Sequence, residues 1–500
     1  MNFMGKHSNY NLNMYHQLEK MSEQIEKLLS EIRGLRLELY QEKELRKKEE
    51  EKNLEQAELI KKLIEENERL KNHKNKDSNN SSKPSSTNIV TPKKKTRSNQ
   101  YNYRTQSKKK IGGQIGHIGT NLSKKDVEKL IEERKIEVRE ITHIIKGDSK
   151  KPALVKYRME LEIKPYIEKH IFKYRKNSKE NLPKEFYTDV TYGDSIKTMS
   201  IHLSCYNVIS YERLSDYFAV ITNGIYQISN GTLVNILKEF GKKSEKTIQV
   251  IEENFLNGKH GYTDETSTKF NKKKLYVRNY SNEKNVIYKI HKNKGHKPIQ
   301  EDNILPRFLG GIMGDHDTTL YKYGSENYEC NIHLGRYLME LMENIPDTSW
   351  TFKMYELLFR MNNTRKIARE YELKEFSKEK IEEYQKEYDK ILELAKKENK
   401  EIKSSYYRKE KAIPLYNRLI KYKINHLYFL EDFQIPFDNN LSEQDLRIFK
   451  NKTKISGGFR SVEVAQYFAN ALSIIKTSIK RKINPYDSIK RIFENQILFN

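Results

Sequence analysis

Apolar residues near the N-terminus recur at alternating spacings of four and three, which is the period of a coiled-coil seam. The residues of the seam are Met14, Leu18, Met21, Ile25, Leu28, Ile32, Leu35 and Leu39. The pattern falters near Glu42 and resumes at Ile60, and Asn67 then takes an a position, where a polar side chain fixes register at a cost in stability. The pattern predicts a dimerisation helix over residues 1–76, with a solvated helix packed on its own chain as the alternative.

The next segment, residues 77–125, has no apolar periodicity and predicts a flexible linker. After a polar stretch it carries two basic clusters with Tyr101 and Tyr103 between them. Basic side chains interleaved with aromatic rings suit phosphate contact and base stacking, although a merely soluble linker is the alternative. The candidate DNA-binding residues of these clusters are Lys93, Lys94, Lys95, Arg97, Lys108, Lys109 and Lys110.

Beyond the linker, the spacing of the apolar positions changes from strand-like to helical. Alternating runs within 134–175 predict a small antiparallel sheet, so a β-rich module is expected over residues 126–200. Residues 201–256 predict two helices separated by a glycine break, with Ser229 or Asn230 as the N-cap of the second. Such a pair can be a DNA-reading helix-turn-helix, and it is just as often ordinary helix packing.

Strand-like patterns return in residues 257–346, where the order of elements is informative. Strands are expected at 260–270, 273–281 and 285–292, then a helix near 297–303 and a strand within 308–324. Three strands, a helix and a fourth strand match the mixed sheet of the RNase H-like fold, an α/β fold. Residues 347–428 predict an all-helical insertion, 429–465 the second part of the core, and 466–500 a helical tail.

Three carboxylates fall at positions where this fold would gather them. Asp264 lies in the first predicted strand, Asp315 at the end of the fourth, and Glu443 in the first turn of a late helix. Gathered without a cation they would repel each other, so their pKa values would rise or a metal would bind. Their hard oxygen atoms suit two Mg²⁺ or Mn²⁺ ions, which could promote phosphodiester displacement. The alternative is three surface carboxylates at turns and a cap.

Basic residues follow Glu443 along the same helix. Arg447 and Lys450 lie four and seven residues further on and share its face, and Lys454 and Arg460 come after them. A basic face beside a metal–carboxylate site would hold a phosphate backbone. Arg447 could instead be a simple helix-face partner of Glu443.

Composition narrows the class of protein. The 500 residues carry a formal charge of +25 and the pI is about 9.4, which favours nucleic acid as the partner. No run approaches the roughly 18 to 20 apolar residues of a membrane span, so no membrane partner is expected. The two cysteines, Cys205 and Cys330, exclude a disulfide framework and a four-cysteine zinc site. A reducing, cytoplasmic location is expected.

Together these segments resemble the transposases of the insertion sequence 66 family. The resemblance rests on the order and extent of several motifs along most of the chain. Besides the N-terminal zipper, they are NSSKPSS at 80–86, GGQIGH at 112–117, SYERLSDYF at 210–218, ISNGTLVNIL at 228–237, GYTDET at 261–266, GDHDTTLYKYG at 314–324, YECNIHLGRYL at 328–338 and PFDNNLSEQDLRIFKNKTKISGGFRS at 436–461.

The resemblance implies a DDE-type recombinase with a helical insertion before its glutamate. It places the catalytic and metal-binding carboxylates on Asp264, Asp315 and Glu443, with Asp317 as a less favoured second aspartate. Cys330 and His333 match a Cys-x-x-His element of the family, but two residues do not complete a tetrahedral zinc site, so helix packing is the expected role and no zinc is expected. Many members carry a cysteine zinc module in the region that matches 126–200, where this chain has no cysteine.

The function expected from this resemblance is DNA transposition. Such an enzyme would bind the terminal inverted repeats of its element, pair the ends as a dimer or higher oligomer, and cut and join strands with two Mg²⁺ ions. Small accessory proteins of the element are possible partners, and the nucleoid is the expected place of action. Two alternatives remain: an inactive DNA-binding or end-bridging descendant, and a structure-specific nuclease on the same fold.

Overall fold

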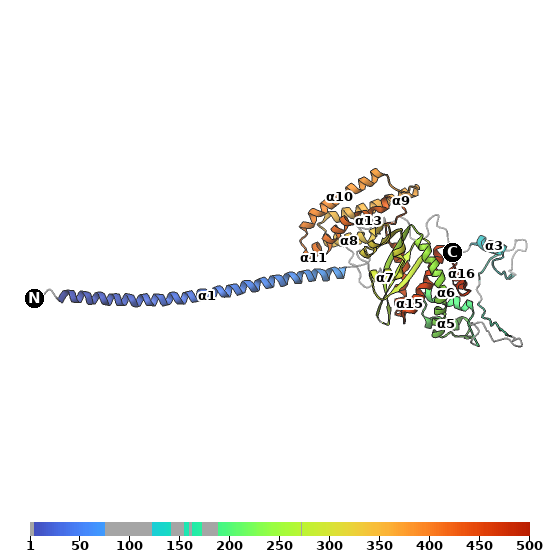
Figure 1. Cartoon of the computed structure of the whole chain (residues 1–500), viewed down its shortest axis with the longest axis horizontal. Helices are drawn as coiled ribbons and strands as arrows, with labels where there is room; N and C mark the ends of the chain where they lie inside the picture. The colour runs from blue at the N-terminus through green and yellow to red at the C-terminus, as the bar shows by residue number, and fades with distance from the viewer. Residues whose placement is uncertain (1–4, 76–122, 142–154, 160–162, 173–188, 272) are drawn as a thin grey trace, which may run out of the picture.

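The computed structural model describes residues 5–75, 123–141, 155–159, 163–172, 189–271 and 273–500 (Figure 1). Helix α1, Gly5–Asn75, extends away from the rest of the protein as one long helix. Near its C-terminal end, Ser404 Oγ donates a hydrogen bond to Glu68 Oε2 (2.6 Å). Seam residues such as Leu28 and Leu35 are more than half exposed, at 56% and 64%. For the side chains described, packing on its own chain therefore does not cover the seam of α1.

The prediction of a small sheet within 134–175 is wrong for the described part of that region. Helix α3, Lys124–Glu132, begins with a capping box in which Ser123 and Asp126 satisfy each other's backbone N–H groups. The described residues that follow form no strand, and Ile141 and Ile167 are 70% and 93% exposed. An alternating sequence becomes a strand only where a neighbouring strand pairs with it and another layer covers its apolar face. Residues 142–154, 160–162 and 173–188 lie outside the described residues.

In the described residues 189–256, which precede the sheet, the chain is largely helical. Its helical elements are α4 (Asp194–Ile201), a π-helical segment (His202–Tyr206), α5 (Tyr211–Ile221) and α6 (Asn230–Leu256). Ser229 is the N-cap of α6, and its side chain accepts the N–H of Thr232 (3.1 Å). A row of apolar residues from Leu233 to Phe255 on α6 is buried, where α6 packs against α15 and β3. One face of the second predicted helix therefore builds the core.

The centre of the protein is a mixed five-stranded sheet with the order β3-β2-β1-β4-β5. Its strands are β1 (His260–Phe270), β2 (Lys273–Ser281), β3 (Val286–His291), β4 (Gly311–Gly314) and β5 (Asn327–Glu329). Strand β2 is antiparallel to both of its neighbours, whereas β1, β4 and β5 are parallel. The prediction of a mixed α/β sheet is confirmed.

The sequence placed the first three strands to within a residue or so, and the fourth less well. Helix α7 (His296–Asp302) and a 3₁₀ turn (Leu305–Arg307) connect β3 to β4, as expected. The predicted strand within 308–324 is mostly not a strand, because β4 ends at Gly314 and Thr318–Lys322 form a 3₁₀ helix. Strand β5 was not predicted, since three residues are too few to show an alternating pattern.

Helices occupy the region between β5 and the helix that carries Glu443. They are α8 (Asn331–Asn344), α9 (Ser349–Glu370), α10 (Lys378–Glu401), α11 (Ser405–Tyr407), α12 (Ile413–Lys421) and α13 (Lys423–Leu427), with a π-helical segment at Arg408–Ala412 and a 3₁₀ turn at Tyr428–Leu430. They share one apolar core around Trp350, which is fully buried. Helix α8 contributes Leu334 and Leu338 to this core, so the helical body begins before residue 347.

Three helices close the chain: α14 (Asn440–Ser456), α15 (Val462–Lys480) and α16 (Pro485–Phe493). Helix α15 packs on β3 and α6, so the expected boundary at residue 465 falls inside an element of the core. Asp445 of α14 accepts Ser281 Oγ of β2 (3.0 Å) and Lys480 Nζ of α15 (2.8 Å). These contacts fix α14 against the sheet. Within the described ranges, no helix has an apolar stretch long enough to cross a membrane.

Candidate active site

Two of the predicted carboxylates lie side by side on parallel strands. Tyr262 of β1 pairs with Met313 of β4, and Asp264 and Asp315 each follow two residues later. Because side chains alternate along a strand, equal offsets from a paired position place both carboxylates at one level and on one face of the sheet. The parallel register thus joins residues that are far apart in the sequence.

Buried amide and hydroxyl groups connect Asp264 to the helix that carries Glu443. Asn279 of β2 accepts the backbone N–H of Asp264 with its Oδ1 (3.0 Å) and also accepts Ser442 Oγ (2.7 Å). Its Nδ2 donates to the carbonyl oxygen of Ser442 (3.3 Å). Asn279 and Ser442 are both fully buried, so these bonds hold the first turn of α14 against β1 and β2. Glu443 is the next residue.

The residue before α14 has a different role from the one its sequence suggests. Asn439 occupies the N-cap position, yet its side chain makes no capping bond. Instead, its Nδ2 donates to the carbonyl oxygen of Thr263 (2.9 Å) and to Asp315 Oδ1 (3.0 Å). Asn439 is fully buried and therefore joins β1, the end of β4 and α14 at one point.

The three carboxylates affect each other's ionisation. Burial, followed by the charge of Glu443, raises the pKa of Asp264 to about 6. Burial, followed by the charges of Asp264 and Glu443, raises the pKa of Asp315 to about 8. The structure therefore brings Asp264, Asp315 and Glu443 together, and the cost of ionising them favours a cation among them.

A first prediction concerns the stability of the metal-free protein. The raised pKa means that folded Asp315 keeps a proton that the unfolded chain releases above about pH 4. The folded state therefore loses stability relative to the unfolded chain as pH rises from about 4 towards about 8, because buried Asp315 must then ionise. Asp315→Asn should therefore raise the melting temperature in chelator, and by more at about pH 8 than at about pH 5. Asp317→Asn is the matched control, and a difference that does not depend on pH would contradict the prediction.

Positive charge lies along the rim of this carboxylate cluster. Arg336 of α8 places NH1 4.0 Å from Glu443 Oε1, and Lys450 is close enough to lower the pKa of Asp264. The other predicted basic residues here, Arg447, Lys454 and Arg460, are exposed. The predicted basic residues of the linker, 93–97 and 108–110, lie outside the described residues.

Asp317 belongs to a different cluster from Asp315. Its Oδ2 lies 3.6 Å from Arg278, which also binds Glu265 at 3.1 Å. Glu265 and Asp264 are adjacent in β1, so their side chains point to opposite faces of the sheet. Asp317 Oδ1 also accepts the N–H of Thr319 (3.0 Å) at the start of a 3₁₀ helix. The geometry favours Asp315 over Asp317 as the second aspartate of the site.

Comparison with known families agrees with this geometry. The sequence model described as "Transposase IS66 family" matches residues 189–467, which is more than half of the chain. The chain belongs to the IS66 transposase family. The match includes all three carboxylates, and membership implies DNA transposition as the biological process. The family resemblance noted from the sequence is confirmed. No curated protein matches the chain significantly.

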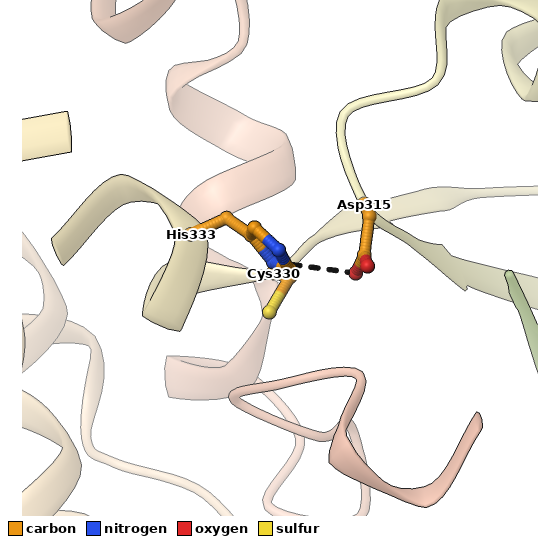
Figure 2. A group of neighbouring side chains, drawn as sticks. All are labelled: Asp315, Cys330 and His333. Atoms are coloured by element: carbon orange, nitrogen blue, oxygen red, sulfur yellow. Dashed lines mark ion pairs between the residues drawn. The ribbon is translucent and has the colours of Figure 1, made fainter. Parts of the chain in front are cut away.

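In this IS66 family member, the Cys-x-x-His pair lies beside Asp315 (Figure 2). Cys330 is the N-cap of α8 and is completely buried, and its Sγ accepts the backbone N–H of Asn439 (3.3 Å). His333 is 5% exposed, and its Nδ1 lies 3.4 Å from Asp315 Oδ1. Its Nε2 accepts from Arg336 NH1 (3.1 Å). The pair therefore lies beside the candidate site.

A second buried cluster next to Asp315 is centred on Glu329 at the end of β5. His426 Nε2 lies 2.6 Å from Glu329 Oε2, and His316 Nε2 lies 3.5 Å from the same oxygen. Arg418 and Tyr321 both contact Oε1. Although burial alone would raise it, the hydrogen bond from His426 and the other polar contacts hold the pKa of Glu329 at about 2. This carboxylate anchors α12 and α13 to the sheet.

Sequence reasoning found the three carboxylates but missed the residues that place them. No sequence pattern indicates the bonds of Asn279, and Asn439 precedes a predicted helix, where asparagine indicates only a cap. Arg336 follows His333 by three residues, so it shares that residue's face of the predicted helix. That spacing was the only available signal, and it acquires meaning only when α8 is seen beside Glu443.

Proposed function

We propose that the chain is a DNA transposase that cleaves and joins DNA strands at the ends of its element. Asp264, Asp315 and Glu443 are its catalytic carboxylates in this proposal. The observation that carries it is the parallel register of β1 and β4, which places two aspartates together while α14 adds the glutamate. Membership of the IS66 family supports the same reaction class.

The fold assigned to the catalytic body is RNase H-like. In support, the strand order is β3-β2-β1-β4-β5 with only β2 antiparallel, and helices pack on the sheet. Asp264 lies on the central strand, Asp315 at the end of its parallel neighbour, and Glu443 on a helix against both β1 and β2. The long segment between Asp315 and Glu443 is the helical insertion.

The donor set fits Mg²⁺ or Mn²⁺, as an IS66 transposase requires in this proposal. Asp264, Asp315 and Glu443 offer hard oxygen ligands, and burial together with the charge of neighbouring carboxylates raises the pKa values of both aspartates. When bound, two such ions would activate a water or a 3′-hydroxyl and stabilise the leaving oxygen. Asn439 holds Asp315 in place through its Nδ2. Arg336 and Lys450 would hold DNA phosphates beside the carboxylates.

The test is strand cleavage and strand transfer on DNA that carries the inverted repeats flanking the gene, with Mg²⁺. A transposase produces 3′-hydroxyl ends at the element boundaries and joins them to target DNA. Cleavage at branched structures without dependence on the repeats would instead identify a structure-specific nuclease. Binding of the repeats without cleavage in Mg²⁺ or Mn²⁺ would identify an inactive end-bridging descendant.

DNA binding by the α14 face gives a second prediction. Arg447 and Lys450 are exposed one and two turns beyond Glu443, where a phosphate backbone would pass. The double change Arg447→Gln and Lys450→Gln should reduce the slope of log affinity against log salt by about two, because two phosphate contacts disappear. Lys390→Gln with Lys397→Gln on exposed positions of α10 is the matched control. An equal slope in both double variants would place the DNA elsewhere.

Dimerisation through α1 is the proposed means of pairing the two ends. The described seam residues are exposed, and a two-stranded coiled coil would bury them. Ile32→Asp with Leu35→Asp should lower the molar mass in light scattering to that of the monomer. Lys20→Asp with Lys27→Asp, on the outer face of the two preceding heptads, should leave the dimer intact. A mass that is unchanged by the seam substitutions would exclude this interface.

A further inference from the structure

Three side chains with metal-binding atoms lie together beside the carboxylate cluster (Figure 2). Asp315 follows β4, Cys330 immediately precedes α8, and His333 lies in the first turn of α8. One ligand atom from each, a carboxylate oxygen, Sγ and an imidazole nitrogen, lies within 4.8 Å of both others. The sequence paired only Cys330 with His333, and the fold brings Asp315 to them.

With their present hydrogen bonds, these three side chains still offer atoms that could bind a metal ion. His333 Nδ1 is buried and has no hydrogen-bond partner, although it faces Asp315 Oδ1 at 3.4 Å. Buried polar atoms are normally satisfied, so an orphaned ring nitrogen aimed at a carboxylate needs an explanation. Burial, followed by the charge of Asp315, raises the pKa of the Cys330 thiol, so Cys330 is a thiol in the metal-free protein. The backbone N–H that its Sγ accepts from Asn439 acts in the opposite direction. The 14-residue helix α8 also starts at Cys330, and its positive end favours a thiolate there.

We propose that Asp315, Cys330 and His333 bind one divalent transition-metal ion of the Zn²⁺ type, through oxygen, sulfur and Nδ1. Mixed sulfur, nitrogen and oxygen donors select such ions, whereas Mg²⁺ prefers oxygen alone. The aspartate and the thiolate together balance the charge of a dication. Three protein ligands leave a fourth position for water or for an oxygen of the substrate.

Metal binding redistributes protons in a defined way. In the metal-free structure Arg336 donates to His333 Nε2, so the neutral ring carries its proton on Nδ1. On binding, Nδ1 coordinates the metal, the ring proton moves to Nε2, and the Cys330 thiol and the Asp315 carboxyl release their protons to solvent. Arg336 NH1 then turns to Glu443 Oε1, which is already 4.0 Å away.

The neighbouring histidine cluster is a weaker candidate for a metal. Glu329 lies between His316 and His426, but the guanidinium of Arg418 already contacts this carboxylate. A second cation there would be repelled by Arg418 in a buried setting. Among the described residues no guanidinium pairs directly with Asp315, although the charge of Arg336 acts on it from further away. Asp315 contacts Asn439 and His333.

The experiment uses the full-length protein and Co²⁺ as the probe. Binding of Co²⁺ should produce a thiolate-to-cobalt charge-transfer absorption in the near ultraviolet that saturates at one ion per chain and is displaced by Zn²⁺. Cys330→Ser should abolish this absorption, and His333→Asn should weaken Co²⁺ binding at least about tenfold. Cys205→Ser is the matched control, because Cys205 is the other cysteine of the chain and is buried in the main core.

Two results would overturn the inference. One is the absence of a charge-transfer band in the folded wild type, and the other is a band that persists in Cys330→Ser. If Cys330→Ser fails to fold, the His333→Asn titration decides. The inference shares Asp315 with the proposed function, but its outcome is separate: Asp264→Ala should abolish strand cleavage while it retains the cobalt band. Cleavage without a band rejects the site, and a band without cleavage rejects only the proposed function.

Discussion

Asp264→Asn, Asp315→Asn and Glu443→Gln will each lower the rate of strand cleavage at element ends by at least about a thousandfold. Each change keeps the size of the side chain and removes the negative charge that would hold a divalent ion among the three groups. Loss of the ion removes the stabilisation of the attacking and leaving oxygens together. Single-turnover cleavage of end-labelled DNA measures the rate, and a gel-shift assay should show that the repeats are still bound.

Asp317→Asn is the control for this experiment. It lies two residues from Asp315, but it pairs with Arg278 beside Glu265 on the other face of the sheet. Asparagine retains the Oδ1 that accepts the N–H of Thr319, so the local turn should persist. Cleavage by this variant should stay close to the wild-type rate. If Asp317→Asn were as inactive as Asp315→Asn, or if all three carboxylate variants cleaved normally, the assignment of the site would be wrong.

Glu329→Ala will lower the free energy of unfolding of the helical body by about 3–5 kcal/mol, the usual cost of removing one partner from a buried ion pair. Glu329 is 2% exposed and binds Arg418 and His426, so its loss leaves a guanidinium and an imidazole without their anion. The fluorescence of Trp350, the single tryptophan, reports on this body because its ring is buried there. Urea titration of the variant measures the change.

The low pKa of Glu329 in the folded protein also determines how the stability loss in Glu329→Ala depends on pH. The folded pKa of Glu329, about 2, is below the ordinary value of 4.5, so its stabilisation is present above about pH 4.5 and is lost as pH falls towards 2. The difference between wild type and variant should therefore shrink on acidification. Glu393→Ala, at an exposed position of α10, should change stability little at any pH. A loss below about 1 kcal/mol for Glu329→Ala near neutral pH would contradict the prediction.

Local patterns were sufficient for most of the regular elements in the catalytic region. Strands β1, β2 and β3 are rich in β-branched and aromatic residues, so each was located from its own sequence, and α7 and α14 were placed close to their observed bounds. The same reasoning failed within 134–175, where apolar and polar residues alternate but the described residues find no partner strand. Alternation shows that a strand is possible, whereas pairing depends on what else the fold brings near.

The sequence by itself determined the residue types of the site, the family, and the heptad seam of α1, because each is written in contiguous motifs. Only the tertiary structure decided which carboxylates meet. The register of β4 against β1 joins Asp315 to Asp264, and the bonds of Asn279 to Ser442 bring Glu443 to both. It also decided that Cys330 and His333 face Asp315. The pairing register joins segments 51 residues apart and the buried hydrogen bonds join segments 163 residues apart, so the periodicity of one segment carries no record of them.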